Sequence, residues 1–176
     1  YNISEIREGD EYPGYRVHLK ALYPPLAVPL TVDVTTGDKI TPREIEYTFK
    51  LLFDDKTISI MAYNLETILA EKLETVISRG QANTRPRDFY DIHILYSLRG
   101  NSCDMSILKQ ALEQTTLKRG SIDRLKDYKE IINSVMDSEK MQRFWNKYRE
   151  DFNYAADITF ETVCRTIIEV MDEVNF

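Results

Sequence analysis

The hydrophobic period of this sequence changes once, near Tyr63, and that change constrains the fold more than any other feature. Before Tyr63, apolar and polar residues alternate with a period of two, which is typical of strands with one solvent-facing side. After it, apolar residues recur every three to four positions, which is typical of amphipathic helices. The sequence therefore predicts an α+β fold in two domains, with a mostly antiparallel sheet in residues 1–63 and a helical bundle in residues 64–176.

The alternation predicts four strands in the first part, which cover Tyr15–Ala21, Leu30–Thr35, about Glu44–Phe53, and Thr57–Ala62. Pro24-Pro25 is expected to end the first strand, and Pro29 to precede the second, because proline donates no ladder hydrogen bond. The last two strands flank a short polar turn, so we expect them to form a hairpin.

The second part begins with a helix start signal. Asn64 can cap the backbone donors of a helix over Leu65–Arg79, and Gly80 can end that helix. Five further helices are expected, one after Arg85-Pro86 and the others over Met105–Lys118, Ile122–Asp137, Glu139–Asp151 and Phe160–Glu173. Trp145 lies on an apolar stripe, so we expect it to pack in the core rather than stack on a nucleic-acid base.

Composition excludes several classes of protein. With 176 residues, 43% of them hydrophobic, the chain is able to bury a core. It has no apolar run near 18 residues and no basic-apolar leader, so we expect no membrane contact and a cytoplasmic location. The net charge of −6 disfavours a nucleic-acid coat protein or a plain helical RNA-binding domain, unless basic residues cluster in space.

Cysteine and histidine spacing gives no sign of a metal site. Cys103 and Cys164 have no nearby CxxC or His partner, so neither a disulfide framework nor zinc is indicated, and both are expected to be core thiols. His18 and His93 have no partner at metal spacing and are left without a role. The sequence also lacks GxSxG, HExxH, P-loop and GxGxxG motifs.

Asp33 is the first polar residue at an energetically unfavourable position. It stands between Val32 and Val34 in a predicted strand, where aspartate is disfavoured. One interpretation is that this face of the sheet is solvated, as Thr31 and Thr35 would allow. The other is that the strand holds the carboxylate rigidly to bind a divalent cation, since Mg²⁺ prefers oxygen ligands.

Lys72 is the second such residue, because Leu69 and Val76 place it beside the apolar stripe of its helix. Its ammonium can reach solvent while its long aliphatic stem covers apolar surface. Alternatively, the ammonium holds a phosphate or pairs with a carboxylate across a cleft. Glu71 and Glu74 lie elsewhere on this helix and are expected to be solvated.

The third site is Arg87-Asp88-Phe89-Tyr90-Asp91, near the start of the next helix. Asp88 lies in the first turn, where a carboxylate interacts with the positive end of the helix dipole. This interaction alone would stabilise the helix by about 0.3–1 kcal/mol, so Asp88 needs no other role. Asp91 lies one turn further along on the apolar side, and buried charges are normally paired. It therefore needs a partner, such as Arg87 or Lys72.

Three segments in this order carry a family resemblance: Leu30–Asp38 (LTVDVTTGD), Tyr63–Arg79 (YNLETILAEKLETVISR) and Arg87–Ile92 (RDFYDI). Together they resemble the AbiEii/AbiGii-type nucleotidyltransferase toxins, over about Gly14 to Leu95. The resemblance implies a polymerase-β-like nucleotidyltransferase core with a helical domain. It also implies the toxin of a toxin–antitoxin or abortive phage-infection system, with a cognate antitoxin as a partner.

The resemblance further implies transfer of a nucleoside monophosphate from an NTP to an acceptor, with RNA such as tRNA expected and Mg²⁺ as cofactor. Asp33 takes the place of the family's metal-binding carboxylate on a later strand, and Lys72 and Asp88 match its helical lysine and aspartate. Lys72 is expected to offset phosphate charge, and Asp88 to act at the acceptor or to orient Lys72. Arg79 and Arg87 are expected phosphate contacts, and Asp91 a supporting residue.

The sequence departs from the family pattern at one point. It contains no glycine-serine loop followed by Asp-x-Asp, and Glu8-Gly9-Asp10 does not replace it. Since the chain also opens with Tyr1, we expect it to be the C-terminal portion of a longer protein and inactive by itself. The alternative hypothesis is a non-enzymatic protein-interaction module derived from the same fold.

Overall fold

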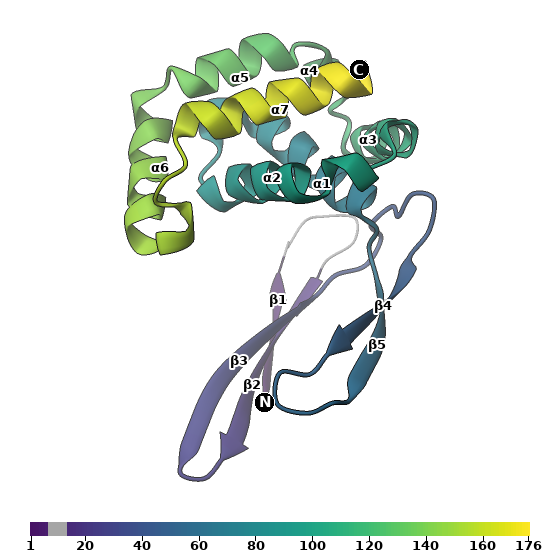
Figure 1. Ribbon diagram of the computed structural model, residues 1–176, viewed down its shortest axis with the longest axis vertical. Helices are drawn as coiled ribbons and strands as arrows, with labels where there is room; N and C mark the ends of the chain where they lie inside the picture. Colours follow the sequence, from purple (N-terminus) through teal and green to yellow (C-terminus); the bar gives the residue numbers. More distant parts are fainter. Residues whose placement is uncertain (7–13) are drawn as a thin grey trace. The chain divides into compact units, whose positions relative to one another are not determined.

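The computed structural model describes residues 1–6 and 14–176, so Glu8-Gly9-Asp10 lies outside the described residues. The described residues divide into two compact units, Tyr1–Asp38 and Lys39–Phe176 (Figure 1). Strands come first and helices follow, and every strand pairing is antiparallel, which confirms the predicted α+β class. No helix among the described residues is long and apolar enough to cross a membrane.

The first unit is a three-stranded sheet in the order β1-β2-β3, formed by β1 (Asn2–Ile6), β2 (Gly14–Tyr23) and β3 (Leu26–Val34). β1 was absent from the sequence prediction. β3 begins at Leu26, before Pro29, because it is an outer strand of this sheet and an outer strand tolerates a residue without a backbone N–H. Pro24 and Pro25 form the turn between β2 and β3.

The two faces of this sheet differ in chemistry. Cross-strand pairs such as Tyr15 with Val34 and Leu19 with Leu30 lie on one face. Arg16 with Asp33 lies on the opposite face, because successive side chains of a strand alternate. The period-two pattern therefore describes one continuous apolar face and one largely polar face that carries Asp33.

The second unit opens with the predicted hairpin, formed by β4 (Ile45–Lys50) and β5 (Thr57–Ala62). It is a separate two-stranded sheet, so the first third of the chain holds two antiparallel sheets rather than one. Thr41, which precedes the hairpin, is tied to the first helix, since its backbone N–H donates to Thr67 Oγ1 at 3.0 Å. This bond ties the residues just after Asp38 to α1. The boundary between the two units therefore falls at Asp38 and not at the change of hydrophobic period near Tyr63. The assignment of residues 1–63 to a nucleotidyltransferase core stays a prediction.

Seven helices follow, and their bounds are α1 (Leu65–Arg79), α2 (Pro86–Arg99), α3 (Met105–Arg119), α4 (Ile122–Lys126), α5 (Tyr128–Met136), α6 (Glu139–Asp151) and α7 (Phe160–Val174). Short 3₁₀ turns occupy Gly80–Ala82, Gly100–Ser102 and Asn153–Ala155. The single helix predicted over Ile122–Asp137 is two helices that meet at Asp127. The Asp127 N–H bonds to the carbonyl of Arg124 three residues back, so the α-helical ladder is interrupted there.

Helix ends follow the local signals. Asn64 Oδ1 accepts a 3.1 Å bond from the Thr67 N–H and caps α1, as predicted. The backbone N–H of Gly80 returns to Val76 and ends this helix with a positive φ of 51°. Gly120 ends α3 in the left-handed conformation, which glycine adopts without a Cβ clash.

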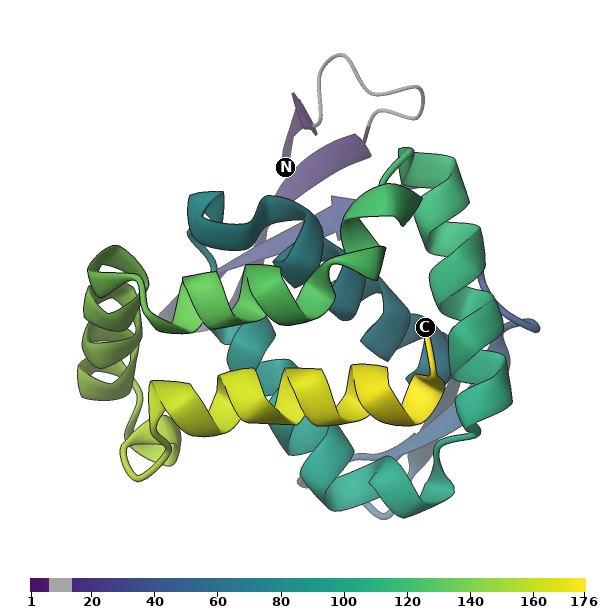
Figure 2. The same ribbon diagram turned by 90° about the horizontal axis from the view of Figure 1, so that it is seen from above.

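The core lies among the helices of the second unit. α1 supplies Leu69, Leu73 and Val76, all fully buried. α7 packs against both α2 and α5, and Figure 2 shows α5 and α7 side by side. Trp145 on α6 is buried, with its indole N–H donating to the carbonyl of Ile158 at 3.0 Å. The prediction that Trp145 packs in the core is confirmed.

Candidate functional site

Lys72 reaches across from α1 to two carboxylates of α2. Its Nζ donates to Asp88 Oδ1 at 3.1 Å and to Asp91 Oδ2 at 2.7 Å. The side chain of Lys72 is 23% exposed, and those of Asp88 and Asp91 are 16% and 24% exposed. Of the two interpretations of Lys72, the structure therefore supports the cation paired across two helices rather than a stem that only reaches for solvent.

The start of α2 supplies the other members of this group. Arg87 and Asp91 are four residues apart on one side of α2, and Arg87 Nε lies 3.8 Å from Asp91 Oδ2. Asp91 thus contacts both partners that the sequence suggested. We refer to Lys72, Arg87, Asp88 and Asp91 as the Lys72 cluster. It contains two cations and two carboxylates, so its formal charge is balanced.

The Lys72 cluster imposes a condition on phosphate binding. The Lys72 ammonium already donates to two carboxylates, so a phosphate that binds it either takes the third N–H donor beside them or displaces one of them. Arg87 is the nearby cation able to take up Asp91 when that happens, because it is largely exposed and only slightly beyond hydrogen-bond distance. The geometry therefore suits an exchange between an internal carboxylate and an incoming anion.

A second ion-pair network on α1 was not predicted. Glu74 is only 3% exposed, and both Glu74 and Glu71 pair with Arg119 at the end of α3. Ser121 Oγ donates to Glu74 at 2.8 Å. The prediction that Glu71 and Glu74 are solvated is wrong for Glu74, which is buried, while Glu71 is 24% exposed and also pairs with Arg119. We call this group (Glu71, Glu74, Arg119 and Ser121) the Arg119 network.

Electrostatics explain how Arg119 stays charged in this place. Burial of its guanidinium acts to lower its pKa, but the carboxylates of Glu71 and Glu74 outweigh burial, so the pKa is raised. Such a buried pair is costly to break, because one removed partner leaves the other charge without compensation. The network joins α1 to α3 and fixes the helix that carries Lys72.

Asp33 lies at the polar face of the first unit, where its two carboxylate oxygens accept from Arg16 Nε and Nη2, each at 2.7 Å. Asp33 raises the pKa of Arg16 through this hydrogen bond. A strand-held carboxylate is the donor type that Mg²⁺ prefers, so Asp33 suits the role of one metal ligand once Arg16 releases an oxygen. No group of three or more His, Cys, Asp or Glu side chains gathers as a metal site in residues 1–6 and 14–176.

Asp33 and the Lys72 cluster lie in different units, and each is described within its own unit. Arg79 is exposed in the last turn of α1. It is seven residues from Lys72, which is about 10 Å along a helix axis at 1.5 Å per residue. Of the six site residues expected from the sequence, the structure therefore brings together Lys72, Arg87, Asp88 and Asp91.

The two cysteines and His93 are buried or partly buried among the helices. Both thiols are free, and burial raises the pKa of Cys103 to about 11 and that of Cys164 to about 12. His93 Nδ1 lies 2.8 Å from Thr166 Oγ1 of α7, and burial lowers the pKa of His93. His18 lies on β2 and is exposed. These observations agree with core thiols and give neither histidine a ligand role.

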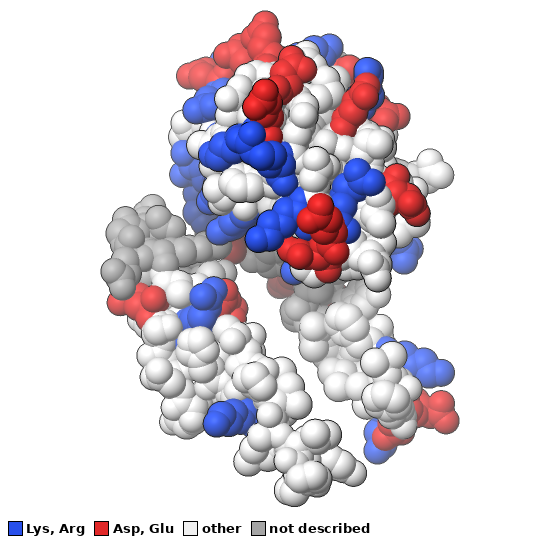
Figure 3. All heavy atoms as spheres, turned by 90° about the vertical axis from the view of Figure 1, so that its left-hand side faces the viewer, with Lys and Arg blue, Asp and Glu red and all other residues white. Residues whose placement is uncertain are grey.

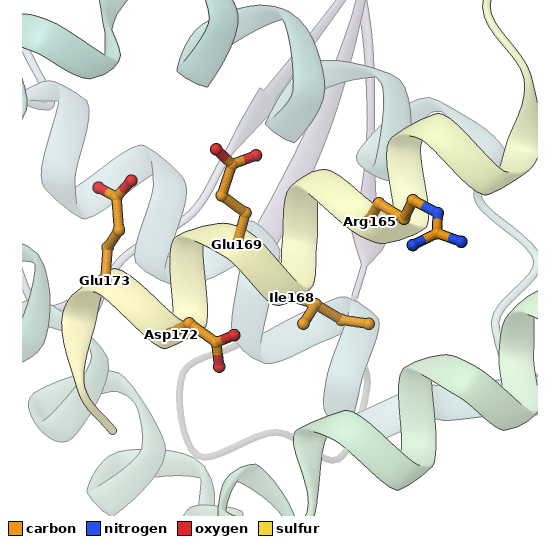
Figure 4. A pocket seen from close by; sticks show the side chains of 5 residues that line it. All are labelled: Arg165, Ile168, Glu169, Asp172 and Glu173. Atoms are coloured by element: carbon orange, nitrogen blue, oxygen red, sulfur yellow. The ribbon is translucent and has the colours of Figure 1, made fainter.

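A shallow pocket lies along α7, lined by Arg165, Ile168, Glu169, Asp172 and Glu173 (Figure 4). Two of its acidic residues, Asp172 and Glu173, are engaged by neighbouring helices. Tyr96 Oη donates to Glu173 at 2.5 Å, and Lys129 Nζ lies 2.9 Å from Asp172. The pocket is therefore the outer side of the contacts that hold α7 in place.

A protein-family model described as "Nucleotidyl transferase AbiEii toxin, Type IV TA system" matches residues 2–166. The chain belongs to this family. The AbiEii match spans the strand that holds Asp33, the helices that hold the Lys72 cluster, and the first part of α7, so it extends well beyond the similarity expected from the sequence. No curated protein and no solved structure matches the chain significantly. AbiEii membership confirms the family prediction and supports a toxin nucleotidyltransferase of a toxin–antitoxin system.

Proposed function

We propose that this chain contributes Asp33, Lys72 and Asp88 to a nucleotidyltransferase that transfers a nucleoside monophosphate from an NTP to an RNA acceptor, with tRNA as the expected acceptor. The observation that carries the proposal is the Lys72 cluster, a partly buried cation held by two carboxylates in a chain of the AbiEii family. Charged side chains held in place on rigid elements are typical of sites that act on charged substrates.

In the proposed reaction, an acceptor hydroxyl oxygen bonds to the α-phosphorus, and the bond from that phosphorus to the α,β-bridging oxygen breaks. Pyrophosphate leaves, and the hydroxyl proton passes to water. Lys72 offsets phosphate charge, which stabilises the transition state electrostatically. Mg²⁺, when bound, neutralises charge on the triphosphate, and Asp33 would be one of its oxygen ligands.

Asp91 is a positioning residue in this proposal, and Asp88 either orients Lys72 in the same way or acts at the acceptor. Their bonds to Nζ hold the Lys72 ammonium at one place between α1 and α2. When phosphate binds, Asp91 shifts its pairing toward Arg87, so this carboxylate keeps a cationic partner. Arg87 and Arg79 are further cations for phosphate contact.

The test uses the protein as its gene encodes it, incubated with labelled NTPs, Mg²⁺ and total RNA. We expect label to be transferred to RNA by the unchanged protein and lost in Asp33→Ala, and we expect the 176-residue chain alone to transfer none. Equal labelling of RNA by the unchanged protein and by Asp33→Ala would show that Asp33 is not required for the transfer.

Asp88→Asn separates the two roles considered for Asp88. If Asp88 orients Lys72, the KM for the NTP rises and the KM for RNA stays constant. If it acts at the acceptor, the KM for RNA changes instead. Asp88→Glu, which keeps the charge, is expected to restore part of the activity in the first case.

The interaction-module hypothesis has one observation in its favour. The apolar face of the first unit is exposed, and it includes Tyr15, Leu19, Leu30 and Val32. Exposed apolar surface of this kind is typical of protein-binding sites, and a cognate antitoxin is the partner expected for this family. A purified protein that transfers no label but forms a stable complex with the product of the neighbouring gene would support this hypothesis over the enzyme.

A further inference from the structure

Four aromatic rings gather where α6 ends and where α2 begins. Tyr90 of α2 has its ring centroid 4.8 Å from that of Tyr154, and Tyr148 of α6 has its centroid 4.8 Å from that of Phe152. Phe152 and Tyr154 stack on each other at 5.3 Å with an interplanar angle of 29°. We call Tyr90, Tyr148, Phe152 and Tyr154 the aromatic corner.

The aromatic corner has a buried side and an open side. Tyr148 is buried and contacts Trp145 of the core, with ring centroids 5.5 Å apart. Phe152 and Tyr154 are 41% and 54% exposed. Each of these two rings packs against a neighbouring ring and leaves part of its surface accessible, so a ligand can reach both of them.

Hydrogen bonds fix the segment that carries the open rings. The Phe152 N–H donates to the Tyr148 carbonyl at 3.0 Å, and the Tyr148 and Tyr154 hydroxyls lie 3.0 Å apart. Arg149 Nε donates to the carbonyl of Ala156 at 2.8 Å, just beyond the exposed rings. The rings are therefore held before any ligand arrives, which lowers the entropic cost of binding.

The corner adjoins the Lys72 cluster. Tyr90 directly precedes Asp91 and lies three residues after Arg87, so it shares one side of α2 with that cation. Arg87 is 77% exposed at its side chain. Figure 3 shows Lys and Arg side chains gathered beside acidic ones on one face of the helical part. Fixed aromatic rings next to exposed cations are the combination with which proteins bind nucleotides, through base stacking and phosphate pairing.

We propose that the aromatic corner is a stacking platform for a nucleobase, whose phosphate pairs with Arg87 of the Lys72 cluster. This inference rests on the proposed function, because the same site would then hold both the base and the phosphates. The base can belong to the NTP or to the end of the RNA acceptor. Because stacking uses the face that every base has, the platform would give affinity with little base preference.

The experiment measures dissociation constants of the full-length protein by equilibrium dialysis, with labelled ATP, GTP, CTP and UTP in one arm and a short single-stranded RNA in the other. The variants are Tyr154→Ser, Phe152→Ser and the double change. We expect the double variant to raise the Kd about 5- to 150-fold, as base–aromatic stacking energies imply, in the arm whose base the platform holds. Phe152→Tyr keeps both rings and the bond between the Tyr148 and Tyr154 hydroxyls, so it is expected to keep the Kd of the unchanged protein.

Two controls separate stacking from general damage. Leu117→Ser alters another exposed apolar side chain, on α3, and is expected to leave both arms unchanged. Ribose 5′-triphosphate, which has no base, is expected to bind the unchanged protein and the double variant equally. Circular dichroism checks folding, and Tyr154→Ser alone replaces the double variant if the latter does not fold.

Unchanged Kd values in both arms for the folded variant would overturn the platform. The proposed function fails in a different way, by absence of label transfer in the unchanged protein. A protein that transfers label normally with both rings removed would therefore contradict the aromatic corner while leaving the nucleotidyltransferase proposal intact.

Discussion

Two ion-pair networks share helix α1, and they differ in what surrounds them. The Arg119 network contains Glu74, which is almost completely buried, and joins α1 to α3. The Lys72 cluster joins α1 to α2 with partly exposed partners and a second cation, Arg87, within reach. The first network is closed at Glu74, which is 3% exposed and pairs with Arg119. The second can exchange a partner with solvent or a ligand, so charge pairs a few residues apart on one helix can serve stability or binding.

The largest effect is expected from Arg119→Met. It would leave Glu74 buried with only the Ser121 hydroxyl among the network's donors, and breaking such a pair costs about 3–5 kcal/mol. Urea unfolding followed by circular dichroism measures the change in the free energy of unfolding. Arg143→Met, which breaks an exposed pair with Glu139, is the matched control and should cost about 0.5 kcal/mol or less. Equal costs for the two variants would contradict a closed, structural Arg119 network.

The next effect is expected from Lys72→Met, and it concerns activity. Loss of a cation at a phosphate should lower the rate of label transfer about 100-fold or more. The free energy of unfolding should fall by less than about 2 kcal/mol, because the carboxylates left behind are partly exposed. A variant that is strongly destabilised but fully active when folded would reverse the contrast between the two networks.

Asn64→Ala tests the helix that carries both networks. It removes the cap on Thr67 and the 2.7 Å bond from Asn64 Nδ2 to the Thr41 carbonyl. The expected loss is about 1–2 kcal/mol in the free energy of unfolding, with label transfer per folded molecule unchanged. Asn64→Asp, which keeps the capping oxygen, should recover most of the stability, and a loss of activity in the folded variant would show that α1 also moves during the reaction.

The smallest effect is a pH dependence from His93, on the side of α2 that faces α7. Burial lowers its pKa, so the unfolded chain binds this proton more readily than the folded chain does. Stability should therefore be complete above the usual histidine pKa of about 6.5 and decrease as the pH falls below it. In His93→Gln, which can still bond to Thr166, this decrease should be smaller. An identical pH profile in both proteins would assign the acid sensitivity to other groups.

Local signals in the sequence predicted a large part of the helical fold. Asn64 and Gly80 set the ends of α1 because capping and left-handed backbone conformations depend on a few neighbouring residues. The break at Asp127 was missed, since the apolar stripe continues through Tyr128 and hides it. β1 was missed because it is short and owes its strand conformation to pairing with β2.

The candidate site was predictable where the chain supplies partners at close spacing. The pairing of Asp91 with Arg87 follows from their i,i+4 spacing, whereas Lys72, 19 residues away on α1, was a candidate only because a buried carboxylate needs a partner. The Arg119 network was not predictable, because Glu74 and Arg119 are 45 residues apart and meet only when α1 and α3 pack. The partner of Asp33 depends on strand register, which the Pro24-Pro25 turn sets and the alternation alone does not.

Pro29 in β3 affects the tendency of this protein to associate with copies of itself at high concentration. β3 is an outer strand of the described sheet and, like its neighbour β2, carries exposed apolar residues, a combination that invites strand-by-strand association of copies. A proline there interrupts the row of backbone donors that such growth requires. The residue that first marked the beginning of a strand is thus expected to act as a guard against fibrous self-association at high concentration.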